Sequence, residues 1–142
     1  SSEILLAIGE IDCRLDSGII KHRNKYPEKN MTKLIKTTVE NYIDYIFKLN
    51  SGTGHNITIQ GVPCPNIDTK NIPTEKVLEL IDVIRELNQV LKNKSNKVGY
   101  AFLDVHKLTD NGDGFSNSTW NLDCFHLSPE GMHEAWRRHA NY

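Results

Sequence analysis

The sequence predicts an α/β domain built around a parallel sheet. Segments of strand length alternate with longer amphipathic helical segments along the chain, which is the pattern of α/β folds. The first strand-like segment is apolar without alternation, as strands covered on both faces are. Of the 142 residues, 38% are hydrophobic and 25% are charged, proportions typical of one globular core. No repeat or linker divides the chain, so residues 1–142 are assigned to a single domain.

The first half predicts a strand, a helix and a second strand. The apolar run at residues 4–9, which ends in glycine, is the first strand. A polar, basic loop follows it. Residues 31–49 then predict an amphipathic helix, because their apolar side chains recur with a period of 3.6 residues: Ile35, Val39, Tyr42, Ile43 and Ile46. The second strand covers residues 57–62 and is ended by Pro63 and Pro65.

The second half predicts a helix, a strand, a long loop and a last helix. A helix begins at Pro73 and presents one apolar face: Val77, Leu80, Ile81, Ile84, Leu87 and Leu91. Residues 98–105 form the third strand. Ser128 and Pro129 open the last helix as its cap and first turn. Its expected inner face is formed by Met132, Ala135, Trp136 and His139.

Three strands make a small sheet, and the chain begins almost at once with a strand of the buried type. We therefore expect a partner chain, or an N-terminal segment absent from this sequence, to complete the sheet.

Charge and composition exclude several classes of protein. Lys and Arg number 17 against 18 Asp and Glu, and this balance argues against a nucleic-acid partner. No apolar run is long enough for a membrane span, and no signal peptide is visible. Without a signal peptide, and with an odd number of cysteines, cytoplasmic location is favoured.

The sequence predicts neither a metal site nor a cofactor. Cys13, Cys64 and Cys124 lack the spacing of zinc ligands. His106 has no partner at ligand spacing, and residues 110–114 lack the ligand register of a calcium loop.

Candidate functional residues follow the predicted strands, because ligands of open α/β sheets bind at the carboxyl ends of the strands. Gly9, Glu10, Asp12 and Arg14 follow the first strand, and Asn66 follows the second. In the loop before the last helix, Asp123 and His126 are three positions apart, a spacing that allows a carboxylate to orient an imidazole as general base. A surface histidine beside a turn-capping aspartate would show the same pattern.

Two segments together resemble the SGNH (GDSL-type) hydrolase superfamily: Gly9-Glu10-Ile11-Asp12-Cys13-Arg14 after the first strand, and Asp123-Cys124-Phe125-His126-Leu127-Ser128-Pro129 before the last helix. The resemblance implies a flavodoxin-like, three-layer α/β/α domain that is incomplete on its N-terminal side. It also implies that Asp123 orients His126, and that His126 is the base for a serine that attacks an ester.

The resemblance covers only the second half of the family's motifs. The Gly-Asp-Ser motif with the nucleophile is absent, and Ile11 stands where the family has an asparagine that stabilises the oxyanion. Isoleucine cannot donate a hydrogen bond, so that role would pass to backbone N–H groups or to Arg14.

Two functions remain open from the sequence. The first is an ester hydrolase acting on a small-molecule or glycan ester, with its serine outside this chain. The second is a non-catalytic module that binds a small molecule or glycan through Arg14, Asn66, Asp123 and His126. A flavodoxin-like domain with an unrelated ligand is disfavoured, because no glycine-rich phosphate loop follows a strand.

Overall fold

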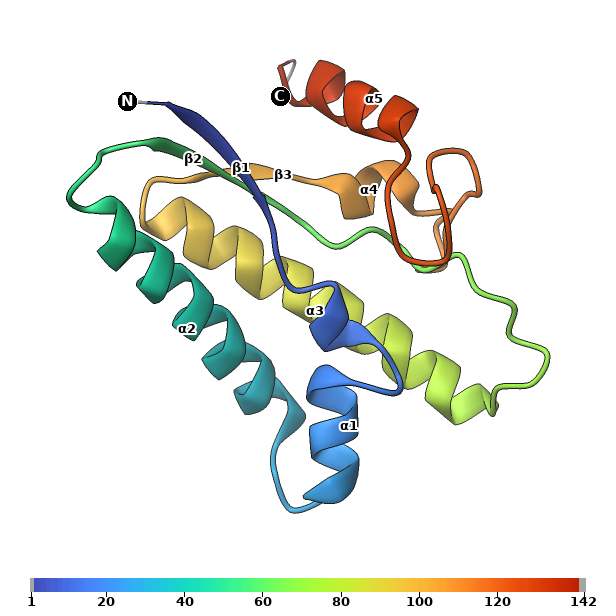
Figure 1. Ribbon diagram of the computed structural model, residues 1–142. Helices are drawn as coiled ribbons and strands as arrows, with labels where there is room; N and C mark the ends of the chain where they lie inside the picture. Colours follow the sequence, from blue (N-terminus) through green and yellow to red (C-terminus); the bar gives the residue numbers. More distant parts are fainter. Residues whose placement is uncertain (1, 141–142) are drawn as a thin grey trace.

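A computed structural model describes residues 2–140. It contains a three-stranded, fully parallel sheet in the order β1-β2-β3, between two unequal layers of helices (Figure 1). The elements are, in chain order, β1 (Glu3–Ala7), η1 (Ile11–Cys13), α1 (Gly18–Lys25), α2 (Met31–Asn50), β2 (Asn56–Gln60), α3 (Thr74–Lys97), β3 (Ala101–Leu103), α4 (Val105–Thr109) and α5 (Pro129–His139). The predicted α/β fold class is confirmed.

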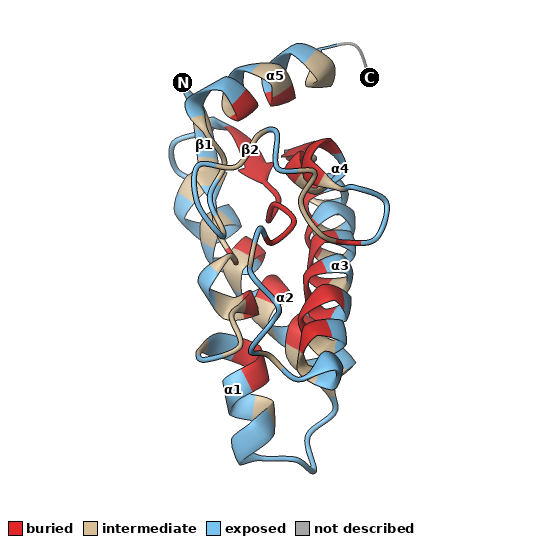
Figure 2. Cartoon of the chain, turned by 90° about the vertical axis from the view of Figure 1, so that its right-hand side faces the viewer, coloured by how far each residue is buried: buried red, intermediate tan, exposed pale blue. Residues whose placement is uncertain are grey.

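The larger layer consists of α2 and α3, which pack against each other and against one face of the sheet (Figure 1). Their predicted apolar faces form the main core, in which Ile35, Val39 and Leu87 are fully buried. Figure 2 shows this burial along α3 and β2. Asn30 begins α2 by accepting a hydrogen bond from the backbone N–H of Lys33 at 3.0 Å.

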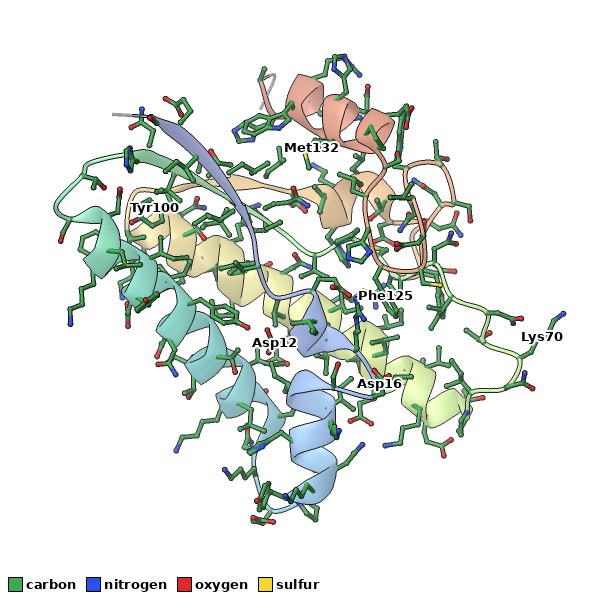
Figure 3. All side chains as sticks on the ribbon, viewed as in Figure 1. Asp12, Asp16, Lys70, Tyr100, Phe125 and Met132 are labelled. Atoms are coloured by element: carbon green, nitrogen blue, oxygen red, sulfur yellow. The ribbon has the colours of Figure 1, made fainter. Side chains whose placement is uncertain are left out.

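The smaller layer is α5, whose main contacts are with β3 and α4. Ser128 caps it as predicted, accepting from the N–H of Gly131 at 3.0 Å. A second, smaller core joins Met132 and Ala135 to Leu103 and its neighbours (Figure 3). Trp136, predicted on the inner face, is 39% exposed, because this narrow contact covers only the Met132–Ala135 side of the helix.

The prediction that the first strand is covered on both faces is wrong. Along β1, partly buried residues alternate with exposed ones. Ile4 and Leu6 pack on the main core, whereas Leu5 is 36% exposed. The reason is position: β1 is an edge strand, and α5 lies over the opposite edge of the sheet.

Two short α-helices, α1 and α4, and the single 3-10 turn η1 were not predicted. The basic loop after the first strand contains α1, whose buried residues are only Ile19 and Ile20. The third strand is shorter than predicted and gives way to α4, because Asp104 caps that helix by accepting from the N–H of Lys107 at 3.0 Å. Among the helices of residues 2–140, none combines the length and apolarity that crossing a membrane requires.

Candidate active site

The loop before α5 folds back on itself and lies beside the carboxyl ends of β1 and β2. Asn121 and Leu127 form an antiparallel bridge, and the N–H of Leu122 donates to the carbonyl of His126 at 2.8 Å. The loop is also tied to the segment after β2, where the N–H of Asn66 donates to the carbonyl of Cys124 at 2.8 Å. These backbone bonds hold His126 at the edge of the sheet where α/β proteins bind ligands.

Asp123 and His126 form the predicted pair. The Nδ1 atom of His126 lies 2.9 and 3.0 Å from the two carboxylate oxygens of Asp123. The same carboxylate accepts from the backbone N–H groups of Phe125 at 2.9 Å and His126 at 2.8 Å. These bonds, that of Phe125 first, lower the pKa of Asp123 to about 2. An ionised Asp123 holds the proton of a neutral imidazole on Nδ1, which leaves Nε2 as the acceptor.

Glu10 and Arg14 complete a group of charged side chains around this pair. Glu10 accepts two hydrogen bonds from Arg14, from Nε at 2.7 Å and from Nη2 at 3.1 Å. Its second oxygen lies 3.7 Å from Nε2 of His126. The Arg14 guanidinium lies 5.0 Å from the ring centroid of Phe125, which fixes its position from the other side. Glu10, Arg14, Asp123 and His126 are called the rim cluster below.

The other predicted site residues lie around the rim cluster without joining it. Gly9 makes the turn after β1 at a φ of +97°, a value that favours glycine. Asp12 lies in η1 (Figure 3) and accepts a hydrogen bond from the hydroxyl of Tyr42 on α2. Burial, and after it the charge of Glu10, raises the pKa of Asp12. Asn66 accepts from the hydroxyl of Ser118 at 3.2 Å and so supports the loop.

A small cavity of about 130 Å³ opens beside His126 and Glu10. Gln60 lines it from the end of β2, and this side chain is 7% exposed with no hydrogen-bond partner for Oε1. An unpaired buried oxygen is costly, so Gln60 is suited to accept from a group that enters the cavity. Gln60 was not predicted as a site residue, although a glutamine within an otherwise apolar strand could have indicated one. Larger cavities lie away from the rim cluster, along α1 and α3 and beside α5.

Asn88 of α3 fixes the backbone at Val62, between Gly61 and Pro63, which both line this cavity. Its buried amide donates to the carbonyls of Val62 and Ile84, each at 2.9 Å, and accepts from the N–H of Val62 at 2.8 Å. Gly61 fits against Asn88 only because it lacks a side chain, since a Cβ there would lie 2.6 Å from the Asn88 amide oxygen. Asn88 therefore sets the backbone path at the end of β2.

The three cysteines are free thiols. Cys13 and Cys64 are buried, and Cys124 is exposed beside His126 in the loop. The structure corrects the expectation for His106, because this residue lies next to Cys64 and Asp110.

The chain is thus a mixed α/β protein whose parallel sheet lies between two layers of helices. No protein-family model and no curated protein sequence matches it. Its structure is similar to that of phospholipase A1 from Streptomyces albidoflavus NA297, with a TM-score of 0.57 and 16% sequence identity. The similarity covers 99% of this chain and 68% of the phospholipase chain. At this identity the similarity shows a shared fold.

Proposed function

We propose that this chain is the base-bearing part of an ester hydrolase of the SGNH type. The observation that carries the proposal is the Asp123–His126 pair, in which Nδ1 is held by a carboxylate and Nε2 faces Glu10 at the carboxyl edge of the sheet. A general base needs this arrangement, in which one nitrogen is anchored and the other is ready to accept a proton. The fold shared with a phospholipase A1, an ester hydrolase by name, supports the same class.

In the proposed reaction, a serine hydroxyl attacks the acyl carbonyl while His126 Nε2 takes the hydroxyl proton. The tetrahedral intermediate collapses to an acyl-enzyme, and Nε2 gives the proton to the departing alcohol. A water molecule then attacks the acyl-enzyme while Nε2 takes its proton, and the acid is released as Nε2 returns the proton to the serine. Asp123 stays ionised throughout and stabilises the imidazolium. We assign the serine to a segment or partner chain outside these 142 residues, which would also complete the sheet of this single domain.

Two further roles follow from the same geometry. Ile11 cannot donate to the oxyanion, and the guanidinium of Arg14 is held by Glu10, so we assign this role to backbone N–H groups. Gln60 would accept from a donor on the substrate or on the serine-bearing segment, since it lines the cavity beside His126. The substrate class that fits is a small-molecule or glycan ester.

The test is hydrolysis of p-nitrophenyl acetate by the full-length natural protein. His126→Ala should lower kcat/KM by at least about 100-fold, the usual contribution of a general base. His133→Ala, on the exposed side of α5, is the matched control and should keep full activity. Equal activity of the His126→Ala variant and the unmodified protein would exclude His126 as the base.

A second candidate function is a non-catalytic binding module on the same edge of the sheet. One observation favours it: within residues 2–140, no serine hydroxyl forms a hydrogen bond with His126. Arg14, Asn66, Asp123 and His126 would then bind a small molecule or glycan. Covalent labelling of the full-length protein by a fluorophosphonate probe separates the two, because only a hydrolase presents an activated serine.

A further inference from the structure

A second group of polar side chains lies at the same end of the sheet, beyond β3. Cys64 belongs to the segment after β2, His106 lies in α4, and Asp110 follows α4 one helical turn later. One ligand atom from each, a sulfur, a ring nitrogen and a carboxylate oxygen, lies within 4.8 Å of the other two. These three residues are called the Cys64 cluster. It shares no residue with the rim cluster and has no part in the proposed hydrolysis.

Two of the three members are already held by hydrogen bonds around them. Cys64 is fully buried, and its N–H donates to the hydroxyl of Thr109 at 2.9 Å. Asp110 accepts from the N–H groups of Gly112 at 2.8 Å and Gly114 at 2.9 Å, and both bonds fall on the same oxygen, Oδ1. Pre-oriented ligands bind an ion at a smaller entropic cost than mobile ones.

The group also contains a polar atom that lacks a partner. Nε2 of His106 is buried and forms no hydrogen bond in the described chain. Buried polar nitrogens without partners are rare in folded proteins because they lose their bonds to water.

A catalytic cysteine would use the same three residue types, but the surroundings of Cys64 are wrong for it. A nucleophilic cysteine is partly exposed and has a lowered pKa. Cys64 is fully buried, its thiol lies 3.5 Å from the carbonyl oxygen of His106 as a donor, and burial raises its pKa to about 12. A buried thiol that donates to a carbonyl is a poor nucleophile.

We propose that Cys64, His106 and Asp110 bind one divalent ion of the zinc class. Sulfur, imidazole nitrogen and carboxylate oxygen are the ligands that Zn²⁺ takes, and three of them leave a fourth position for water. The ligand atoms need only a modest approach from separations within 4.8 Å, because zinc lies about 2.0–2.3 Å from each ligand. On binding, the Sγ–H bond of Cys64 breaks, the proton leaves to solvent, and the sulfur binds the ion.

The charges around the site are compatible with a divalent ion. Arg85 adds one positive charge that acts on both Cys64 and His106. A Cys64 thiolate, Asp110 and Asp113 together supply three negative charges, which balance Arg85 and the ion. His106 also forms part of the wall of a cavity of about 220 Å³ beside the cluster.

The ion would fasten the segment after β2 to α4. Asn121 of the loop that carries His126 donates to the carbonyl of Cys64 at 3.2 Å, so this loop rests on the proposed site. The role that fits is structural: the ion would hold the backbone on which the rim cluster is built.

The test is titration of the full-length apo-protein with Co²⁺, which absorbs in the near ultraviolet when a thiolate binds it. We expect a thiolate band that saturates at one equivalent, with release of about one proton per ion. The band should be lost in Cys64→Ser and binding should weaken at least tenfold in His106→Gln. Cys124→Ser removes the exposed thiol beside His126 and is the matched control, which should keep the band.

Three spectroscopic results would each overturn the proposal: no thiolate band, a band that survives in Cys64→Ser, or a band lost in Cys124→Ser. If Cys64→Ser does not fold, His106→Gln decides, because His106 is only partly buried. Circular dichroism would confirm that this variant is folded. Unchanged Co²⁺ affinity in folded His106→Gln would likewise exclude the site. None of these outcomes depends on esterase activity.

Discussion

Two histidines lie at the carboxyl edge of the same sheet in opposite surroundings. The side chain of His126 is 53% exposed, and its Nδ1 is held by an ionised carboxylate. His106 has a buried Nε2 without a partner, and burial lowers its pKa. The first arrangement suits a group that exchanges protons with a substrate, and the second suits a group that gives a lone pair to a fixed ion. The comparison shows that exposure and neighbouring groups decide which role a histidine side chain suits.

The largest expected effect is on the His126 side of this comparison. Asp123→Asn keeps an oxygen for the backbone N–H groups of Phe125 and His126, but it no longer fixes the proton on Nδ1. We expect kcat for p-nitrophenyl acetate to fall by about 10²–10⁴-fold, with little change in the free energy of unfolding. Asp82→Asn, at an exposed position on α3, is the control. A kcat within twofold of the unmodified protein would contradict the role of Asp123.

A second substitution should destabilise the backbone after β2, which lies between the two histidines' segments. Asn88→Ala leaves the buried N–H and carbonyl of Val62 without partners, just before the segment that carries Cys64. Each unsatisfied group costs about 1–3 kcal/mol, so the free energy of unfolding should fall by at least that amount in urea denaturation. Gln89→Ala, exposed on the same helix, should stay within about 0.5 kcal/mol of the unmodified protein. Equal stability of the two variants would show that β2 does not depend on Asn88.

A smaller effect should distinguish the two partners of Glu10. Arg14 holds the Glu10 carboxylate, which lies 3.7 Å from Nε2 of His126. Arg14→Ala frees this carboxylate to accept a hydrogen bond from the imidazolium form of His126, a form that cannot take the serine proton. We expect kcat to fall about fivefold, which corresponds to about 1 kcal/mol of coupling. The double variant Arg14→Ala/Glu10→Gln should recover most of that loss. If it recovers nothing, Arg14 acts directly on the substrate.

The smallest expected effect is the pH dependence of the Asp123–His126 pair. The pKa of Asp123 is lowered to about 2 from an ordinary value of 3.8, so the folded state binds this proton more weakly than the unfolded chain does. Its stabilising contribution is therefore complete above pH 3.8 and is lost as the pH falls through about 2. An NMR titration of the Asp123 carboxyl carbon measures the midpoint, and a midpoint near 3.8 would mean that the bonds from Phe125 and His126 are absent in solution.

The predictability of the two histidines differs for a physical reason. Asp123 and His126 are three residues apart in one turn, so local geometry alone brings them together. Cys64 and His106 are separated by an entire helix and strand, and only the parallel pairing of β2 with β3 brings their segments to one edge. No local pattern in the sequence predicts that contact.

The fold was likewise predictable only where a local sequence pattern records the packing. The periodic faces of α2 and α3 were predicted because burial of an apolar face shapes the sequence at every turn. The exposed face of β1 was not, since an apolar run such as residues 4–9 does not reveal which neighbours the strand has. Helix α1 was missed because only Ile19 and Ile20 are buried within it, too few to produce a period.

The two unequal cores also imply an order in which the protein opens. The main core joins α2, α3 and the sheet, whereas α5 is held by the few residues around Leu103, Val105 and Ala135. Native-state hydrogen exchange should therefore divide the chain into two cooperative units, with the amides of α5 exchanging before those of α3. The loop of His126 is continuous with the unit that opens first. The proposed base would then lie on the more adaptable part of a rigid frame, where it can adjust to a bound ester without loosening the core.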